Sequence, residues 1–263
     1  MKKIETLVAE KIALGMTINQ AESSVCQQII LNKISKSPLA DNVLLKGGVV
    51  MFNLTKNIRR STEDIDFDLI RYDISDTSVR EFIRILNKND SSYRISVSSI
   101  EELNQDDYKG KRVYTTIQDS SRSIRFKLDI GVHTLLAIEQ ENLCFSFADD
   151  VFLKVNPPEQ IFAEKAYSLA KHGPLTTRFK DVFDMYYLIV NKTINRAMVK
   201  KCFELLSIKG LYGIKSLEDI CEKLNDTLED KQFLKLLKST KDRWLDDDIS
   251  LITKTILDFV YSI

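Results

Sequence analysis

The chain has 263 residues, of which 44% are hydrophobic and 29% are charged, as is ordinary for a soluble globular protein. Lys and Arg together number 38, and so do Asp and Glu. Net charge therefore gives no sign of a nucleic-acid-binding protein, although the cancellation can hide a local basic groove. No apolar run is long enough to span a bilayer and the N-terminus lacks a signal-peptide pattern, so we expect a cytoplasmic protein without membrane contact.

The cysteines and histidines show no catalytic or metal-binding spacing. The four cysteines are far apart and form no CxxC pair: Cys26, Cys144, Cys202 and Cys221. We expect reduced, mostly buried thiols. The two histidines, His133 and His172, belong to no Ser/His/Asp or metal-ligand pattern, and we interpret both as non-catalytic.

The first 35 residues predict two helices. Apolar residues recur at helical spacing over residues 4–14, and a second helix is expected to begin at Thr17. The Thr17 hydroxyl can cap this helix, and the side chain of Gln20, three positions later, can hydrogen-bond back to the backbone of Thr17. An apolar stripe continues through residues 25–34, so both helices are expected to pack against the elements that follow.

Two glycines follow a short apolar strand. Residues 43–45 predict a buried strand, after which Lys46, Gly47 and Gly48 lead into an amphipathic segment at 49–54. Because glycine has no Cβ atom, the backbone can approach a phosphate closely at this turn. The N-terminal amides of the following helix would then point at the anion.

The next strand carries three aspartates. Asp64, Asp66 and Asp68 alternate with apolar residues that would face a core. Neighbouring carboxylates on one strand face repel each other unless a cation compensates. Since Mg²⁺ binds one or two carboxylates together with substrate phosphates, an Asp-x-Asp beside a glycine turn indicates a metal–triphosphate site.

The ordered combination of Gly-Gly, a helix and Thr-x-Asp-x-Asp resembles the first motif of the polymerase-β-like nucleotidyltransferase superfamily. It is most similar to the AbiEii/AbiGii toxin branch, to which the MenT toxins also belong. The resemblance implies that Asp64 and Asp66 are catalytic and bind Mg²⁺. It also implies nucleotide binding by Lys46, Gly47, Gly48 and Thr62.

A mixed sheet is expected to follow the acidic strand. Residues 78–86 predict a helix, three alternating segments lie at 93–97, 113–117 and 124–130, and residues 107–111 are interpreted as a turn.

The third of those alternating segments places Asp129 on the polar face, where the resemblance implies a third catalytic carboxylate that completes the metal site or accepts a proton. The alternative is a surface aspartate in an ion-pair ladder with Lys127.

A boundary is expected at Asn156-Pro157-Pro158, because proline suits the first turn of a helix. The predicted fold is therefore α/β (α+β), with a polymerase-β-like nucleotidyltransferase mixed sheet, flanking helices and N-terminal helices over residues 1–155. An all-helical lobe would occupy residues 156–263. Its helices are predicted at 161–169, 179–190, 197–206, 217–224, 233–237 and 249–260, with Ser216 and Asp248 as N-caps.

Two of these helices contain motifs that resemble those of the family. Lys165 lies in a segment similar to the Glu-Lys motif, which implies that it holds the triphosphate. Arg178-x-x-Asp181-x-x-Asp184 resembles the Arg-x-x-Asp-x-x-Asp signature, which implies that Asp181 is a catalytic base or organiser. We expect Asp181 and Asp184 to share a helix face away from the core residues. The alternatives are a solvated Lys165 and a structural ion-pair cluster around Asp184.

The resemblance implies a toxin-like enzyme of a bacterial toxin–antitoxin or abortive-infection system. It would transfer a nucleoside monophosphate from an NTP to an acceptor, with the 3′ end of tRNA as the first choice, and its antitoxin need not touch it. Two alternatives remain: a nucleotidyltransferase that modifies a protein hydroxyl, and a non-catalytic NTP-binding module.

Overall fold

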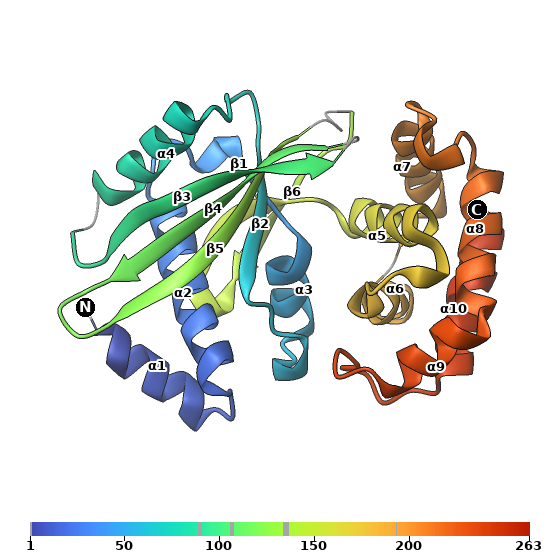
Figure 1. Ribbon diagram of the computed structural model, residues 1–263, viewed down its shortest axis with the longest axis horizontal. Helices are drawn as coiled ribbons and strands as arrows, with labels where there is room; N and C mark the ends of the chain where they lie inside the picture. The colour runs from blue at the N-terminus through green and yellow to red at the C-terminus, as the bar shows by residue number, and fades with distance from the viewer. Residues whose placement is uncertain (1, 89–90, 106–107, 134–136, 193) are drawn as a thin grey trace. The chain divides into compact units, whose positions relative to one another are not determined.

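The computed structural model describes residues 2–88, 91–105, 108–133, 137–192 and 194–263 (Figure 1). The chain divides into two compact units, Met1–Val155 and Asn156–Ile263. The division falls where the last strand ends and two prolines precede the first helix of the second unit. Each unit is described by itself.

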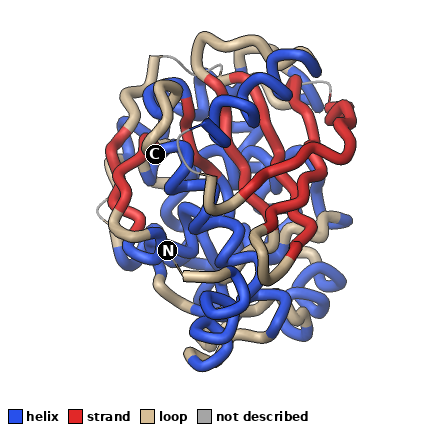
Figure 2. The backbone as a smooth tube through the Cα atoms, turned by 90° about the vertical axis from the view of Figure 1, so that its left-hand side faces the viewer, coloured by secondary structure: helices blue, strands red, loops and turns tan. Residues whose placement is uncertain are grey.

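Within the described residues of the first unit, seven strands form one mixed sheet in the order β3-β4-β5-β2-β1-β7-β6 (Figures 1 and 2). The pairs β2–β5 and β1–β7 are parallel and the other neighbours are antiparallel. The strands are β1 (Val43–Lys46), β2 (Asp64–Leu69), β3 (Arg94–Gln105), β4 (Tyr108–Gln118), β5 (Ser123–Val132), β6 (Glu141–Phe145) and β7 (Val151–Val155).

The described helices of this unit are α1 (Ile4–Ala13), α2 (Ile18–Ser35), α3 (Gly47–Thr55) and α4 (Asp76–Lys88). The predicted capping box of α2 is confirmed, with Thr17 and Gln20 exchanging hydrogen bonds. Helices α2 and α4 contact each other and the sheet, and the ring of Phe82 lies 5.6 Å from that of Phe67 on β2. One face of the sheet is therefore covered by these two helices.

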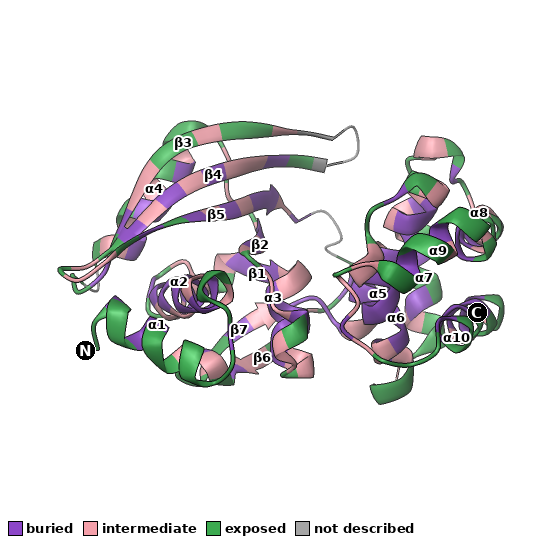
Figure 3. Cartoon of the chain, turned by 60° about the horizontal axis from the view of Figure 1, so that its bottom comes forward, coloured by how far each residue is buried: buried purple, intermediate pink, exposed green. Residues whose placement is uncertain are grey.

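The other face of the sheet carries the polar residues. Along β2, Ile65, Phe67 and Leu69 are completely buried, as predicted, while Asp64 and Asp66 are half-buried. The same alternation runs along β4 and β5, where buried residues change places with more exposed ones (Figure 3). The period of two in the sequence thus identified the two faces correctly.

Two features of the sheet differ from expectation. Residues 108–111 were predicted to lie in a turn but belong to β4, which pairs with both β3 and β5; Asp107 lies outside the described residues. The charges and glycine of this stretch resemble a turn, but pairing on both sides stabilises it as a strand. Strand β6 was not predicted, since Glu141–Phe145 has no clear alternation and its pairing with β7 determines it.

The described part of the second unit is helical and contains no strand, as predicted. Its helices are α5 (Pro158–His172), α6 (Phe179–Asn191), α7 (Arg196–Ser207), α8 (Leu217–Glu229), α9 (Lys231–Ser239) and α10 (Ile249–Tyr261). Ser216 and Asp248 cap α8 and α10, which confirms both predictions. The ring of Phe162 contacts those of Phe203 and Phe259, so α5 packs at the centre of a core with α7 and α10.

All four cysteines are free, and Cys26, Cys202 and Cys221 are buried, as expected. No described helix combines the length and the apolarity needed to cross a membrane.

Candidate active site

The glycine turn packs directly against β2. Gly47 follows β1 with φ of +65°, a left-handed conformation that favours glycine. A Cβ atom on Gly47 would lie 2.2 Å from Oδ2 of Asp66, and one on Gly48 would lie 2.6 Å from Oγ1 of Thr62. Both positions therefore require glycine, because any side chain would displace the polar groups of the neighbouring strand.

Helix α3 begins at this turn, and Lys46 at its N-cap makes no side-chain capping hydrogen bond. The first amides of a helix have no partner within the helix and attract anions. The turn therefore places the first amides of α3, a group that suits an anion, beside Asp66.

Asp64 lies at the start of β2 and is held by neighbours on both sides. The Thr62 hydroxyl donates to Oδ1 of Asp64 at 2.7 Å, and Nζ of Lys127 lies 4.0 Å from its Oδ2. The side-chain amide of Gln27 on α2 donates to the carbonyl oxygens of Thr62 and Asp64. Thr62, predicted to bind the nucleotide, thus orients Asp64 in this structure, and Gln27 is a positioning residue that the sequence did not reveal.

Asp68 shares the polar face of β2 but has a different environment. Its residue exposure is only 5%, and Nζ of Lys46 lies 2.6 Å from its Oδ1. Nδ1 of His133 is 3.7 Å from the other oxygen. Asp68 is therefore a counter-ion of Lys46. Lys46 was predicted to bind the nucleotide, and in this structure its ammonium lies against the sheet beside Asp68.

Asp129 is brought to the aspartates of β2 by the parallel pairing of β5, which places it opposite Asp66. Its carboxylate accepts two hydrogen bonds from Arg112 on β4, Nε to Oδ1 at 2.9 Å and Nη2 to Oδ2 at 2.7 Å. The carboxylate raises the pKa of the Arg112 guanidinium, through the hydrogen bonds first and the charge second. A bidentate pair of this kind fixes the orientation of both side chains.

Arg112 was not identified from the sequence. It lies 17 residues from Asp129, and only the register of the β4–β5 hairpin brings the two together. Counting outward from the turn at Asp119–Arg122 would have paired them, provided that the turn was known.

Two carboxylates beside a turn that suits an anion would fit Mg²⁺, which binds few protein ligands when substrate phosphates supply the rest. Asp64 and Asp66 are half-buried on one face, and Oδ2 of Asp66 lies against the turn. No cluster of three or more His, Cys, Asp or Glu side chains that could hold a metal ion occurs in the part of the chain that the structure describes. The donor set therefore fits a metal completed by phosphate oxygens and not a site built from protein alone.

The second unit contains a separate charged cluster on α5 and α6. Nζ of Lys165 lies 2.5 Å from Oδ1 of Asp181 and 2.8 Å from Oδ2 of Asp184. Arg178 reaches the other oxygen of Asp181 at 3.5 Å. Asp184 has no exposed surface, and Lys165 and Asp181 are 9% and 8% exposed.

The two aspartates share a helix face as predicted, but the expectation that this face points away from the core was wrong. It packs against α5, where Lys165 compensates the burial of both carboxylates.

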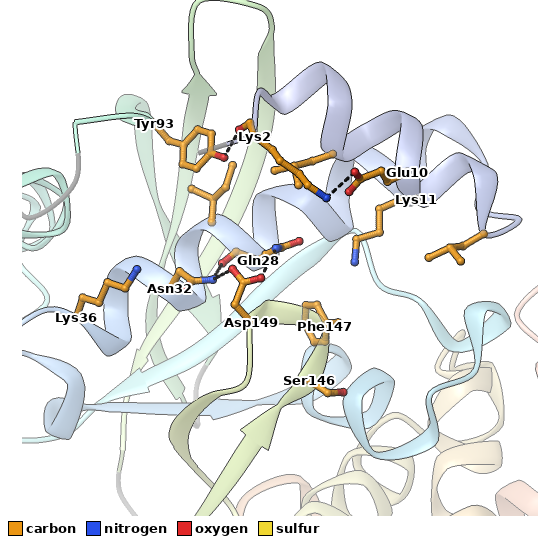
Figure 4. Close-up of a pocket in the computed structure, with 13 residues that line it drawn as sticks. Lys2, Glu10, Lys11, Gln28, Asn32, Lys36, Tyr93, Ser146, Phe147 and Asp149 are labelled. Carbon is orange, nitrogen blue, oxygen red and sulfur yellow. Dashed lines mark hydrogen bonds and ion pairs between the residues drawn. The ribbon is translucent and has the colours of Figure 1, made fainter.

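The predicted residues therefore form two groups. Lys46, Gly47, Gly48, Thr62, Asp64, Asp66 and Asp129 gather on one sheet face of the first unit, and Lys165 with Asp181 lies in the second. A pocket of about 500 Å³ between α1, α2 and the segment at Ser146–Asp149 contains none of them (Figure 4).

The side-chain amides of Gln28 and Asn32 donate to Asp149 in this pocket, at 3.2 and 3.0 Å (Figure 4). The Asp149 carboxylate is thus hydrogen-bonded by two neutral side chains, and it is not part of the aspartate group on β2.

A strand, a glycine turn, a helix and an adjacent Asp-x-Asp strand define a site of the nucleotidyltransferase class. Residues 29–250 match the sequence model of the family described as "Nucleotidyl transferase AbiEii toxin, Type IV TA system". The chain therefore belongs to the AbiEii nucleotidyltransferase toxin family, as predicted. This membership indicates nucleotidyltransferase activity and an antitoxin partner.

Solved structures give weaker similarities. JHP933 from Helicobacter pylori is 13% identical with a TM-score of 0.47, over 94% of this chain and 92% of that one. An antigenic nucleotidyltransferase-like protein from Paracoccidioides brasiliensis is 15% identical with a TM-score of 0.40, over 70% of this chain and 94% of that one. A comparison with curated proteins finds no match.

Proposed function

We propose that the protein transfers a nucleoside monophosphate from an NTP to the 3′ end of tRNA, using Mg²⁺ and releasing pyrophosphate. The observation that carries this proposal is the contact between the glycine turn and Asp66. A Cβ atom on Gly47 would occupy the place of the carboxylate oxygen, so the turn and the acidic strand form one surface. A phosphate bound at the turn would lie beside the carboxylates that suit a cation.

The residues of the first unit would divide the work as follows. Asp64 and Asp66 would hold Mg²⁺, which supplies charge neutralisation on the phosphates. Gly47, Gly48 and the first amides of α3 would bind phosphate oxygens. Thr62 keeps Asp64 oriented through its 2.7 Å hydrogen bond, so the metal ligand needs little rearrangement on binding.

Two residues remain candidates for preparing the attacking hydroxyl, Asp129 and Asp181. Asp129 lies opposite Asp66 in the sheet but is engaged by Arg112, so it would have to share a carboxylate oxygen with the hydroxyl. Asp181 is paired with Lys165, which we propose as the triphosphate ligand. The ammonium would then exchange one anionic partner for another.

The test is label transfer from each of four α-labelled NTPs to total tRNA in the presence of Mg²⁺, resolved on a denaturing gel. We expect label in tRNA with the unchanged protein and a loss of at least about 100-fold with Asp64→Ala. Glu63→Ala is the matched control, because Glu63 is the exposed neighbour of Asp64 and has no assigned role. Its activity should equal that of the unchanged protein.

The same assay separates the alternatives. Label in a protein band that depends on Asp64 would replace the tRNA acceptor with a protein hydroxyl. No label in any acceptor, with NTP binding retained, would identify a non-catalytic binding module. Equal transfer by Asp64→Ala would refute the assignment of the metal site.

A further inference from the structure

Within the described residues of the first unit, strands β3, β4 and β5 present one face that none of this unit's helices covers. On the other face, Val113, Ile117 and Leu128 are buried. The open face is defined here by eight half-buried or exposed residues: Arg94, Ser96, Ser99, Glu101, Tyr114, Thr116, Arg125 and Lys127. Figure 3 shows this alternation along β4 and β5, where buried positions (purple) alternate with half-buried (pink) and exposed (green) ones.

The register makes the open face continuous with the aspartates of β2. Lys127 lies opposite Tyr114 on β4 and opposite Asp64 on β2. Arg125 is the next residue on the same face and lies opposite Thr116, which in turn lies opposite Ser96. Since a strand rises about 3.3 Å per residue, Arg125 stands about 13 Å along β5 from Asp129. The open face is therefore a track that ends at the proposed catalytic centre.

The charge of this track is predominantly positive although the chain as a whole has a net charge of 0. Its charged residues are three cations, Arg94, Arg125 and Lys127, and one carboxylate, Glu101. Among the described residues, Arg94 and Arg125 form no ion pair, and Lys127 is 4.0 Å from Asp64 at the end of the track. Exposed cations on neighbouring strands that outnumber the carboxylates beside them attract a polyanion.

The remaining residues of the open face match single-stranded RNA better than a peptide. Tyr114 is a partly exposed aromatic side chain in the middle strand, and its hydroxyl donates to Oε2 of Glu101 at 3.3 Å. An aromatic ring on an open sheet is a surface on which an unpaired base stacks. Ser96 and Thr116 offer hydroxyl groups that can bond to phosphate or to the 2′-hydroxyl. The face has no large aliphatic side chain to anchor a peptide.

We propose that the open face binds the single-stranded 3′ end of an RNA acceptor, with its terminal hydroxyl toward Asp64 and Asp66. This inference rests on the proposed function for the place of the reacting hydroxyl. The binding itself needs neither NTP nor Mg²⁺, so it can be measured separately from turnover.

The test is fluorescence anisotropy of a labelled single-stranded RNA of about 12 nucleotides, a length within the usual site sizes of such surfaces. We expect the double variant Arg94→Glu/Arg125→Glu to bind at least about 10-fold more weakly. Its slope of log K against log salt, measured between about 50 and 200 mM, should fall by about 0.7 per lost phosphate contact. Tyr114→Leu, which keeps apolar bulk but removes stacking, should bind about 5-fold more weakly with an unchanged slope.

Arg80→Glu is the matched control, because Arg80 is an exposed arginine on α4, which covers the opposite face. It should bind RNA within about twofold of the unchanged protein. Thermal unfolding of every variant, followed by circular dichroism, shows whether the sheet is intact.

Two results would overturn the proposal: no RNA binding by the unchanged protein, or equal binding by the double variant. If tRNA is labelled while the double variant binds RNA normally, the proposed function stands and the open face is not its acceptor site. If RNA binds through the open face but no NTP label is transferred, the binding surface stands and the proposed function fails.

Discussion

Three aspartates on β2 show that the environment of a residue decides its role. Asp64, Asp66 and Asp68 occupy equivalent positions of one strand face, yet Asp64 is oriented by a hydroxyl, Asp66 lies against a glycine and Asp68 is buried with a lysine. A buried carboxylate that already has an ammonium at 2.6 Å gains little from a further cation. We therefore propose the first two aspartates, and not the third, as the metal ligands.

Gly47 is the residue at which this arrangement is most sensitive. We predict that Gly47→Ala lowers the free energy of unfolding by about 1–2 kcal/mol, because alanine is strained at φ of +65°. Its Cβ atom would also push Asp66 away, since the two would be 2.2 Å apart. A displacement of about 1 Å in a catalytic group can reduce turnover by about 100-fold, and we expect a loss of that size in label transfer.

Gly15→Ala is the control for backbone strain. Gly15 has φ of +94° and open space around its Cα atom, so alanine there is strained without touching the site. Both variants should unfold at lower denaturant concentrations, and only Gly47→Ala should lose transfer activity. Equal activity in the two variants would contradict the role given to the turn.

At the scale of elements, the β4–β5 hairpin determines the environment of Asp129, because its register places Arg112 opposite this aspartate. The two hydrogen bonds of 2.9 and 2.7 Å hold Asp129 beside β2. Lysine has a single ammonium and cannot reproduce this forked geometry. We therefore propose Arg112 as a positioning residue that acts through Asp129.

We predict that Arg112→Leu, Arg112→Lys and Asp129→Asn each reduce label transfer by about 10-fold or more. The double variant Arg112→Leu/Asp129→Asn should be no slower than Asp129→Asn alone, because residues that act as one unit are not additive. Turnover numbers measured at saturating NTP test this. Losses that multiply in the double variant would show that Arg112 acts independently of Asp129.

At the scale of the whole molecule, each unit has its own cluster of charged side chains. The cluster in the second unit is buried, and its ammonium compensates two carboxylates. Removing one partner of a buried charge pair is far more destabilising than removing an exposed charge. Lys165 therefore stabilises its own unit, whatever it contributes to nucleotide binding.

Trp244 is the single tryptophan of the chain and is buried in the second unit, with its ring 5.6 Å from that of Tyr187. Its fluorescence thus reports the unfolding of that unit. We predict that Lys165→Met lowers the free energy of unfolding measured by this signal by about 3 kcal/mol. Lys200→Met, at an exposed position of α7, should change it by less than about 0.5 kcal/mol. An unchanged Lys165→Met midpoint together with lost transfer would assign Lys165 to the nucleotide alone.

The amino-acid sequence by itself determined the local features of this protein. The period of two over residues 64–69 and 124–130, the glycine pair after a strand, and the helical period after Pro158 depend on near neighbours in the chain. The order of these motifs also sufficed to identify the family, which the comparison over residues 29–250 confirmed. Capping residues such as Thr17 were equally readable, because a cap and its partner lie three positions apart.

Only the tertiary structure decided which charged groups meet. Periodicity assigns a side chain to a face but does not identify its partner on another element. The pairs Arg112–Asp129 and Lys46–Asp68 follow from strand register, and the burial of Lys165 between Asp181 and Asp184 follows from the packing of α5 against α6. The residues in these contacts are 16 to 22 positions apart in the chain. An intervening chain of that length allows many pairings, and the packing of the folded protein selects one of them.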